Sequence, residues 1–262
     1  MREASLDPNE GAAVEQLEAA GAAAGKPGEA PLGKMKIDLH CHSEASIDCI
    51  TPLGDIPSRC AERGIAVQAI TDHNEIWGAQ TLKAMAEESG SGLTVIVGEE
   101  ITTLEGELIG LFLSAKIEAG LSPEETVKRI KAQGGLVYLP HGFDPMKRSR
   151  LRPGALTRIA SEIDIVETFN ARISQPRWNR AAVRWAQSRE LPISAGSDAH
   201  TRQDIGSAWV EVPARAVGSP QDLLLALEGG TPVGEWTHPA LAVALKFWDD
   251  TRRRWRSRRD KS

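Results

Sequence analysis

The chain has 262 residues, of which 41% are apolar and 26% are charged. This balance is typical of a globular protein with a sizeable core and excludes a disordered or collagen-like chain. No apolar run reaches the roughly 20 residues of a membrane span, and no apolar stretch follows a basic head at the N-terminus, so we expect neither membrane insertion nor secretion. Three cysteines are too few for a disulfide framework, which favours a cytoplasmic protein.

Charge is distributed unevenly along the chain. The formal net charge is -5, yet the last twelve residues hold six Arg and one Lys against one Asp, which is +6 and leaves -11 on the other 250. Phosphate repulsion makes an acidic body a poor binder of nucleic acid, so we expect no specific binding of duplex DNA. The same charge suits a protein that collects cations in an acidic pocket.

Composition divides the chain into three parts. Residues 1–33 are rich in Ala, Gly and Glu, which is weak core material, so we expect a flexible extension there. Regular alternation of strand and helix patterns then begins, and we place one domain at 34–235. Residues 236–262, which include the basic tail, form a second extension in this interpretation.

Predicted strands and helices alternate along this domain. Such alternation is typical of a parallel sheet, either open or closed into a barrel. Ser122 is a predicted helix N-cap, because Pro and two acids follow it. Strands are predicted at 35–40, 66–71, 93–98, 107–113, 135–140, 164–169, 191–196 and, as an eighth, 209–213; helices are predicted at 55–64, 78–89, 122–134 and 175–190.

Polar clusters follow the apolar strands. In a parallel barrel the carboxyl ends of all strands converge on one face, whereas an open sheet concentrates polar ends near one switch point. Six polar strand ends therefore favour an α/β barrel. The clusters are LHCH, ITDHN, VGEEITT, LPHGFD, TFNAR and AGSDAH.

Histidines dominate these clusters. Five of the six fall at predicted strand ends, and only His238 does not. A single histidine is usually structural, but five at equivalent positions, most beside carboxylates, indicate a site for Zn, Mn or Fe. Because residues i and i+2 of a strand share a face, His40 and His42 point the same way, and Asp198 and His200 repeat this spacing.

The ordered motifs H-x-H, T-D-H, G-x-E, P-H and D-x-H resemble those of the PHP (polymerase and histidinol phosphatase) family of metal-dependent phosphoesterases, over about residues 35–213. The matching blocks are HCHSEASID, AITDHN, VGEEITT, LPHGFDP, IVETFNAR and GSDAHTRQDIGSA. The resemblance implies a distorted (β/α)7 barrel with two or three divalent transition-metal ions, Mn, Fe or Zn, at the carboxyl ends of its strands.

The resemblance also implies a set of ligands, and Asp72 is expected either to orient His73 or to contact the substrate. We predict Asp72, His73, Asp198 and His200 as the catalytic residues. The implied ligands are His40, His42 and Asp198 for a first ion, the bridging Glu100 with His141 for a second, and His73, His200 and Asp48 for a third.

One position departs from the family pattern. Many members have a histidine after the bridging glutamate, where this chain reads GELIG at 106–110. Glu107 either replaces that histidine as an oxygen ligand or is an ordinary exposed strand residue. The sequence leaves both alternatives open.

Basic residues follow His141 and the sixth strand. We predict that Lys147, Arg148 and Arg172 bind substrate phosphate, since Arg matches a phosphate with two parallel hydrogen bonds. Asn170 is expected either to bind substrate or to fix the turn.

The family resemblance implies an enzyme that hydrolyses a phosphate ester of a nucleotide or a short oligonucleotide end with metal-activated water, as a phosphatase or exonuclease. Three alternatives remain: a histidinol-phosphate phosphatase, an amidohydrolase-type metal hydrolase, and an inactive metal-binding module. An amidohydrolase usually adds a bridging lysine at a central strand end, which this chain lacks.

Overall fold

A computed structural model describes residues 33–238 of the chain. The predicted N-terminal extension, apart from Gly33, and the basic C-terminal tail lie outside the described residues. Within 33–238, no helix combines the length and the apolar character needed to cross a bilayer.

The described residues contain one nine-stranded sheet with the order β7-β6-β5-β4-β3-β2-β1-β8-β9. All eight predicted strands are present, and the last strand was not predicted. The strands are β1 (Lys34–Asp38), β2 (Ile65–Ile70), β3 (Thr94–Thr103), β4 (Gly106–Leu111), β5 (Leu136–Leu139), β6 (Ile165–Asn170), β7 (Ile193–Gly196), β8 (Ala208–Pro213) and β9 (Thr231–Gly234).

The sheet is mixed, so the expectation of a purely parallel sheet was wrong. β4 is antiparallel to both β3 and β5, because only two residues separate β3 from β4 and a parallel crossover needs many more. β8 is antiparallel to β1 and to β9. The other neighbouring pairs are parallel.

One end of the sheet, β7, approaches β1, and this contact nearly closes strands β1 to β7 into the predicted barrel. The chain after β7 runs beside the chain after β1, where the Asp198 N–H donates to the His40 carbonyl at 2.8 Å and the His42 N–H to the Ala199 carbonyl at 3.1 Å. The Leu39 N–H also donates to the Ala195 carbonyl at 3.2 Å. This distorted α/β barrel confirms the predicted fold class.

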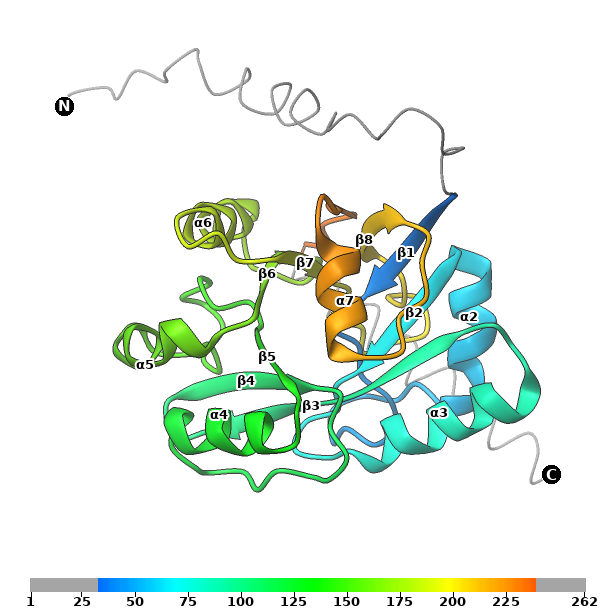
Figure 1. Cartoon of the computed structure of the whole chain (residues 1–262), viewed down its shortest axis with the longest axis horizontal. Helices are drawn as coiled ribbons and strands as arrows, with labels where there is room; N and C mark the ends of the chain where they lie inside the picture. The colour runs from blue at the N-terminus through cyan, green and yellow to red at the C-terminus, as the bar shows by residue number, and fades with distance from the viewer. Residues whose placement is uncertain (1–32, 239–262) are drawn as a thin grey trace, which may run out of the picture. The chain divides into compact units, whose positions relative to one another are not determined.

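Helices surround the barrel (Figure 1). The four predicted helices are present, whereas two further short helices were not predicted. At the start of α4, the Ser122 side chain accepts from the Glu125 N–H at 3.2 Å, which confirms the predicted N-cap. The helices are α2 (Ile56–Arg63), α3 (Trp77–Ser89), α4 (Pro123–Ala132), α5 (Pro153–Ile159), α6 (Pro176–Gln187) and α7 (Pro220–Leu227), with short 3-10 turns η1 (Leu53–Asp55) and η2 (Ala160–Glu162).

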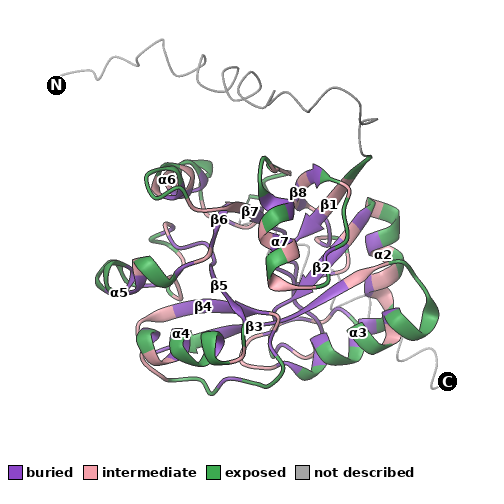
Figure 2. Ribbon diagram, in the orientation of Figure 1, coloured by how far each residue is buried: buried purple, intermediate pink, exposed green. Residues whose placement is uncertain are grey.

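The core has two layers, which follow from the period-two alternation of the strands. Inward side chains such as Ile37, Ile96 and Ile109 fill the barrel, and α7 adds Leu223 and Leu227 to this interior cluster. Outward side chains pack between the strands and the surrounding helices. Figure 2 shows the result, with the strands largely buried and the outer faces of the helices exposed.

Candidate metal centre

The ligands predicted from the sequence converge on one edge of the barrel. Parallel strands all end at the same edge, so residues far apart in the sequence meet there. The residues at this edge are His40 and His42 after β1, His73 after β2, Glu100 in β3, His141 after β5, and Asp198 and His200 after β7.

Strand alternation decides which of two adjacent glutamates in β3 faces this edge. Ile96 lies in the barrel interior, so Gly98 and Glu100 face the same way. Glu99 faces outward, where its carboxylate accepts from the Ile117 N–H at 2.8 Å. Burial raises the pKa of Glu99 to about 7. Glu100 is therefore the glutamate that enters the cluster, and Glu99 is its neighbour on the opposite face.

Glu107 reaches the same edge by a different route. Because β4 runs antiparallel to β3, the first residues of β4 lie beside the last residues of β3, and Glu107 pairs with Thr102. The Glu107 side chain is only 8% exposed. Glu107 is thus buried within the cluster and is not an exposed strand residue.

Four donor atoms form the tightest group. His40 Nε2 lies 3.2 Å from His42 Nε2, and both nitrogens lie 3.3 Å from Glu100 Oε2. Asp198 Oδ1 lies 3.5 Å from His42 Nε2 and 3.8 Å from His40 Nε2. Ligand atoms that surround a tetrahedral zinc ion at about 2.1 Å lie about 3.4 Å apart. The separations of this group therefore fit one transition-metal ion.

Glu100 also contacts a second group through its other oxygen. His141 Nε2 lies 3.0 Å from Glu100 Oε1 and 3.9 Å from Glu107 Oε2, while His73 Nδ1 lies 3.7 Å from Glu107 Oε1. His141 Nδ1 is buried and has no hydrogen-bond partner among the described residues. The two oxygens of the Glu100 carboxylate thus face two different sets of metal-ligand atoms, which is the geometry of a bridging ligand.

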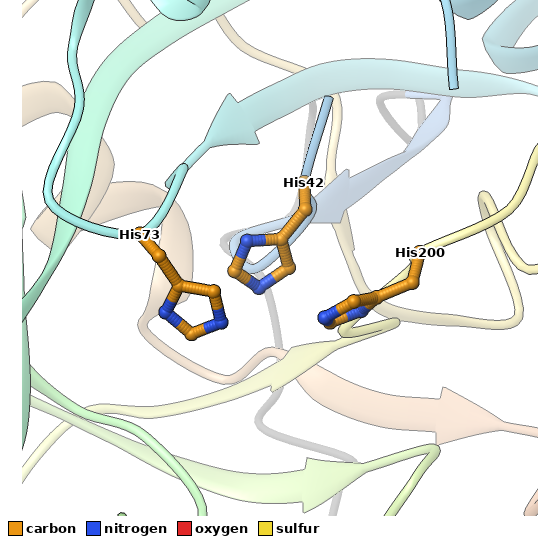
Figure 3. A group of neighbouring side chains, drawn as sticks. All are labelled: His42, His73 and His200. Atoms are coloured by element: carbon orange, nitrogen blue, oxygen red, sulfur yellow. The ribbon is translucent and has the colours of Figure 1, made fainter. Parts of the chain in front are cut away.

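A third group brings together imidazoles from three strand ends, as Figure 3 shows for His42, His73 and His200. The ring centres of His73 and His200 lie 4.6 and 4.4 Å from that of His42. Asp48 completes the group, with one oxygen 2.8 Å from His200 Nε2 and the other 3.9 Å from His73 Nε2. Burial, followed by the charge of His42, lowers the pKa of His200 to about 4, so this imidazole is neutral and able to ligate.

The charges of the buried histidines and glutamates in the cluster also favour a bound cation. Although burial opposes ionisation of His40, the carboxylates of Glu167 and Glu100 raise its pKa well above the usual value. Burial likewise opposes ionisation of Glu100, but His40 and its neighbours hold the pKa of Glu100 well below its usual range. Burial and then the charge of Glu100 raise the pKa of Glu107 to about 8. Glu107 therefore needs a further positive charge beside it to ionise at neutral pH, and a divalent cation supplies that charge.

The cluster forms one wall of a pocket of about 210 Å³ that Lys147, Ser149 and Arg172 also line. The Lys147 ammonium contacts the Asp198 carboxylate, and Arg172 Nη1 donates to the Asp198 carbonyl at 3.1 Å. Burial opposes ionisation of Asp198, but Lys147 and then His40 hold its pKa well below the usual range. Two cations therefore line the same small polar cavity as members of the metal-ligand cluster, and both contact Asp198.

Three predicted site residues lie elsewhere. Arg148 is exposed and does not line the pocket. Asn170 is buried and donates from Nδ2 to Glu167 at 3.0 Å and to Asp198 at 3.2 Å, so it supports the cluster from behind. Asp72 is also buried outside the pocket lining, and its two oxygens accept from the Ser43 N–H and hydroxyl at 2.6 and 2.7 Å.

Two buried carboxylates that contact the site were missing from the sequence prediction. Asp144 accepts from the Met146 N–H at 2.9 Å and from the Ser174 N–H at 2.6 Å, and so ties the loop of Lys147 to the loop of Arg172. Glu167, in β6, contacts His40 Nδ1 at 2.9 Å. Both residues lie in blocks that resemble the family, LPHGFDP and IVETFNAR, but neither belongs to a ligand motif, and their tertiary contacts show what they hold.

An α/β barrel with clustered imidazoles and carboxylates at the carboxyl ends of its strands defines a class of metal-dependent hydrolases. Comparison with known proteins narrows this class. The PHP domain model matches residues 38–140 and the PHP-associated model matches residues 176–232. An uncharacterized protein of Methanocaldococcus jannaschii is 34% identical over 195 residues, which is 72% of this chain and 75% of that protein. The chain belongs to the PHP family, a family of metal-dependent phosphoesterases.

Further similarities cover a shorter segment or the fold alone. A 5'-3' exoribonuclease of Haemophilus influenzae is 38% identical over 68 residues, covering 26% of this chain and 24% of that protein. A two-domain protein of Bacteroides vulgatus that contains a predicted PHP-like metal-dependent phosphoesterase shares the fold, with a TM-score of 0.63 at 17% identity, covering 81% of this chain and 70% of that one. An amidohydrolase of Chromobacterium violaceum has a TM-score of 0.54 at 18% identity, covering 73% of this chain and 96% of that one.

Proposed function

We propose that this protein hydrolyses a phosphate ester of a nucleotide or of a short oligonucleotide end. One observation carries the proposal: a single pocket is lined both by metal-type ligands and by the cations Lys147 and Arg172. That pairing matches a substrate whose reacting phosphate sits at the ligand cluster and whose further phosphate meets the cations. Similarity over a short segment to an exoribonuclease supports the nucleotide class of substrate.

The proposed ligand sets follow the three groups of donors. His40, His42, Asp198 and Glu100 hold one ion, and the second oxygen of Glu100 joins His141 and Glu107 at another. His73, His200 and Asp48 hold a third. Divalent ions at such a site supply a nucleophilic water at neutral pH and neutralise phosphate oxygens. Nitrogen and oxygen ligands without thiolates suit Mn, Fe or Zn.

The remaining side chains of the pocket orient the substrate. Arg172 offers two parallel N–H donors to a phosphate, and its backbone N–H is held by the Asn170 side chain at 2.9 Å. Lys147 contacts Asp198, so once Asp198 is engaged as a ligand the ammonium turns to the substrate phosphate. Asp72 holds the turn after β1 through Ser43 and affects the reaction only through that turn. All of these residues lie inside 34–235, which we propose as the catalytic domain.

The full chain reconstituted with Mn²⁺, Zn²⁺ or Fe²⁺ tests this proposal on a matched panel of substrates. The panel contains nucleoside monophosphates, nucleoside bisphosphates, 5'-phosphorylated short RNA and DNA, histidinol phosphate, and a cyclic amide. We expect release of phosphate or mononucleotide from the nucleotide substrates, faster with two phosphates than with one. Turnover of histidinol phosphate alone, or of the amide alone, contradicts the proposal in favour of the corresponding alternative.

A pair of variants separates the site from a contaminating activity. Asp198→Asn removes a proposed ligand while keeping a residue type that tolerates its positive φ of 51°. His238→Ala changes the one histidine of the chain that lies outside the strand-end clusters. Activity that disappears in the first variant and persists in the second belongs to this pocket.

A further inference from the structure

Glu167 occupies an unusual position beneath the proposed metal site. Its side chain is fully buried within β6 and does not line the pocket. It nevertheless makes four hydrogen bonds. One oxygen receives His40 Nδ1 at 2.9 Å and the Tyr138 hydroxyl at 3.2 Å, and the other receives the His141 N–H at 2.6 Å and Asn170 Nδ2 at 3.0 Å.

Three of the partners, the Tyr138 hydroxyl, the His141 N–H and Asn170 Nδ2, donate to Glu167, so its two oxygens act as acceptors and His40 Nδ1 meets them as a donor. Donation from Nδ1 fixes the proton of His40 on that nitrogen. When His40 ligates as a neutral imidazole, the free lone pair is therefore on the other ring nitrogen, Nε2, which points at His42 and Glu100, at 3.2 and 3.3 Å. A histidine ligand needs this separation of roles between its two nitrogens.

The same carboxylate holds the backbone of a second proposed ligand. His141 has a φ of 29°, a conformation that non-glycine residues rarely adopt and that surrounding contacts must maintain. The short hydrogen bond from its N–H to Glu167 is such a contact. His141 is thereby placed with Nε2 at 3.0 Å from Glu100.

Gly196 packs closely against both Glu167 and His40. A Cβ atom at Gly196 would overlap both the Glu167 carboxylate and His40 Cβ. Glycine at 196 therefore permits His40 and Glu167 to approach one another across β7. Two independent features, the acceptor pattern and this close approach, define the same contact.

We propose that Glu167 is a positioning residue that sets His40 in its metal-ligating form and holds His141 in place, so that one buried carboxylate serves the ligand sets of two ions. This inference rests on the ligand sets of the proposed function. It predicts that a change at Glu167, which touches no substrate and no ion, reduces metal binding.

Glu167→Gln is the sharpest variant, because an amide of the same shape presents one acceptor and one donor in place of two acceptors. If the NH2 faces the backbone N–H of His141, two donors oppose each other. If it faces His40, the Nδ1 atom must accept and the proton moves to Nε2, where it blocks ligation. Either orientation lowers the affinity for zinc. We expect the affinity to fall about 10–100-fold and the protein to lose at least one equivalent of bound zinc.

Tyr138→Phe is the matched control. It removes one donor to Glu167 but leaves the carboxylate and its contacts with both histidines intact. We expect the zinc content of the wild type and an affinity within about threefold of it, since a neutral hydrogen bond contributes little on average. Circular dichroism and thermal unfolding of the metal-free proteins show whether both variants are folded.

Nitrogen-15 NMR of the zinc-loaded full chain reads the His40 ring directly, without any activity assay. We expect a proton on Nδ1 in the wild type and in Tyr138→Phe. In Glu167→Gln we expect its transfer to Nε2 if the NH2 faces His40, and a shifted Nδ1–H signal if the NH2 faces the His141 N–H. A folded Glu167→Gln protein with unchanged zinc affinity overturns the inference, and so does a wild-type His40 ring that lacks the Nδ1 proton. If zinc binding depends on Glu167 but no phosphate ester is hydrolysed, the positioning role stands and the proposed function fails.

Discussion

The two ends of the barrel both bury side chains but are stabilised in opposite ways. At one end, inward side chains such as Ile37 and Ile96 pack with Leu223 of α7, and burial itself is favourable. At the other end, His40 and Glu100 are 0% and 1% exposed, and burial of their charges is costly unless each has a partner. A change at the apolar end therefore affects mainly its own packing. At the polar end, loss of one residue leaves the buried charges of the others without a partner.

The largest expected effect follows from removing one member of the polar set. Asp198→Asn or His40→Ala should lower phosphoesterase activity about 1000-fold or more, or about 4 kcal/mol of transition-state stabilisation, because an ion is lost or misplaced. Elemental analysis should find more than one equivalent of transition metal in the reconstituted wild type and less in either variant.

Circular dichroism must show that these variants are folded, and His238→Ala should retain nearly normal activity. One ion or fewer per reconstituted wild-type chain would contradict a site with several ions.

The apolar end provides the opposite case. Leu223 is fully buried in α7, so Leu223→Ala should reduce the free energy of unfolding by about 2–5 kcal/mol. Metal content per folded chain should stay unchanged, because this packing lies in the interior cluster and not at the ligand edge. Denaturant unfolding and elemental analysis on the same sample test the contrast, and a folded variant that loses metal would show that the two ends are coupled.

The basic wall of the pocket should affect substrate binding more than the chemical step. Arg172→Ala should raise KM with little change in kcat, at a cost of about 1–3 kcal/mol for a charge-assisted hydrogen bond. Arg148→Ala is the matched control, since Arg148 lies outside the pocket lining and its loss should change KM little. Steady-state kinetics should show a larger effect of Arg172→Ala for a substrate with two phosphates than for one. Equal effects on both substrates would argue against recognition of a second phosphate.

The smallest effect is expected at the position that departs from the family pattern. Glu107→Gln keeps the shape of the side chain but replaces a carboxylate with a neutral amide, which is a poorer metal ligand. We expect an affinity for the second ion about 3–10-fold weaker, or a change in the preferred activating metal, measured by metal titration. Unchanged metal stoichiometry and rate would make Glu107 a structural residue.

Local sequence signals were sufficient for much of the molecule. Runs of apolar residues predicted eight of the strands, and Ser122 was recognisable as an N-cap because capping depends only on the next three residues. The histidines at strand ends were also visible, since each follows its strand directly. These features depend on neighbours in the chain, which a sequence displays.

Other features arise only when distant segments meet. The antiparallel course of β4, which carries Glu107 to the site, depends on the length of one connection and on pairing with β5. α5 spans seven residues and is too short for a helical period to be evident. Lys147 lines the pocket and Arg148 does not. This difference likewise depends on how Asp144 holds its loop against Ser174.

The sequence by itself determined the barrel, the strand-end clusters and the kinds of atom available to hold metal ions, because these follow from residue type and local periodicity. Only the tertiary structure decided which carboxylates serve the site. Glu167 belongs to no ligand motif, and it reaches His40, 127 positions away in the chain, because β6 and β7 pair and Gly196 leaves space between them. Hydrogen bonds over such separations depend on which individual side chains meet after folding, which no local pattern encodes.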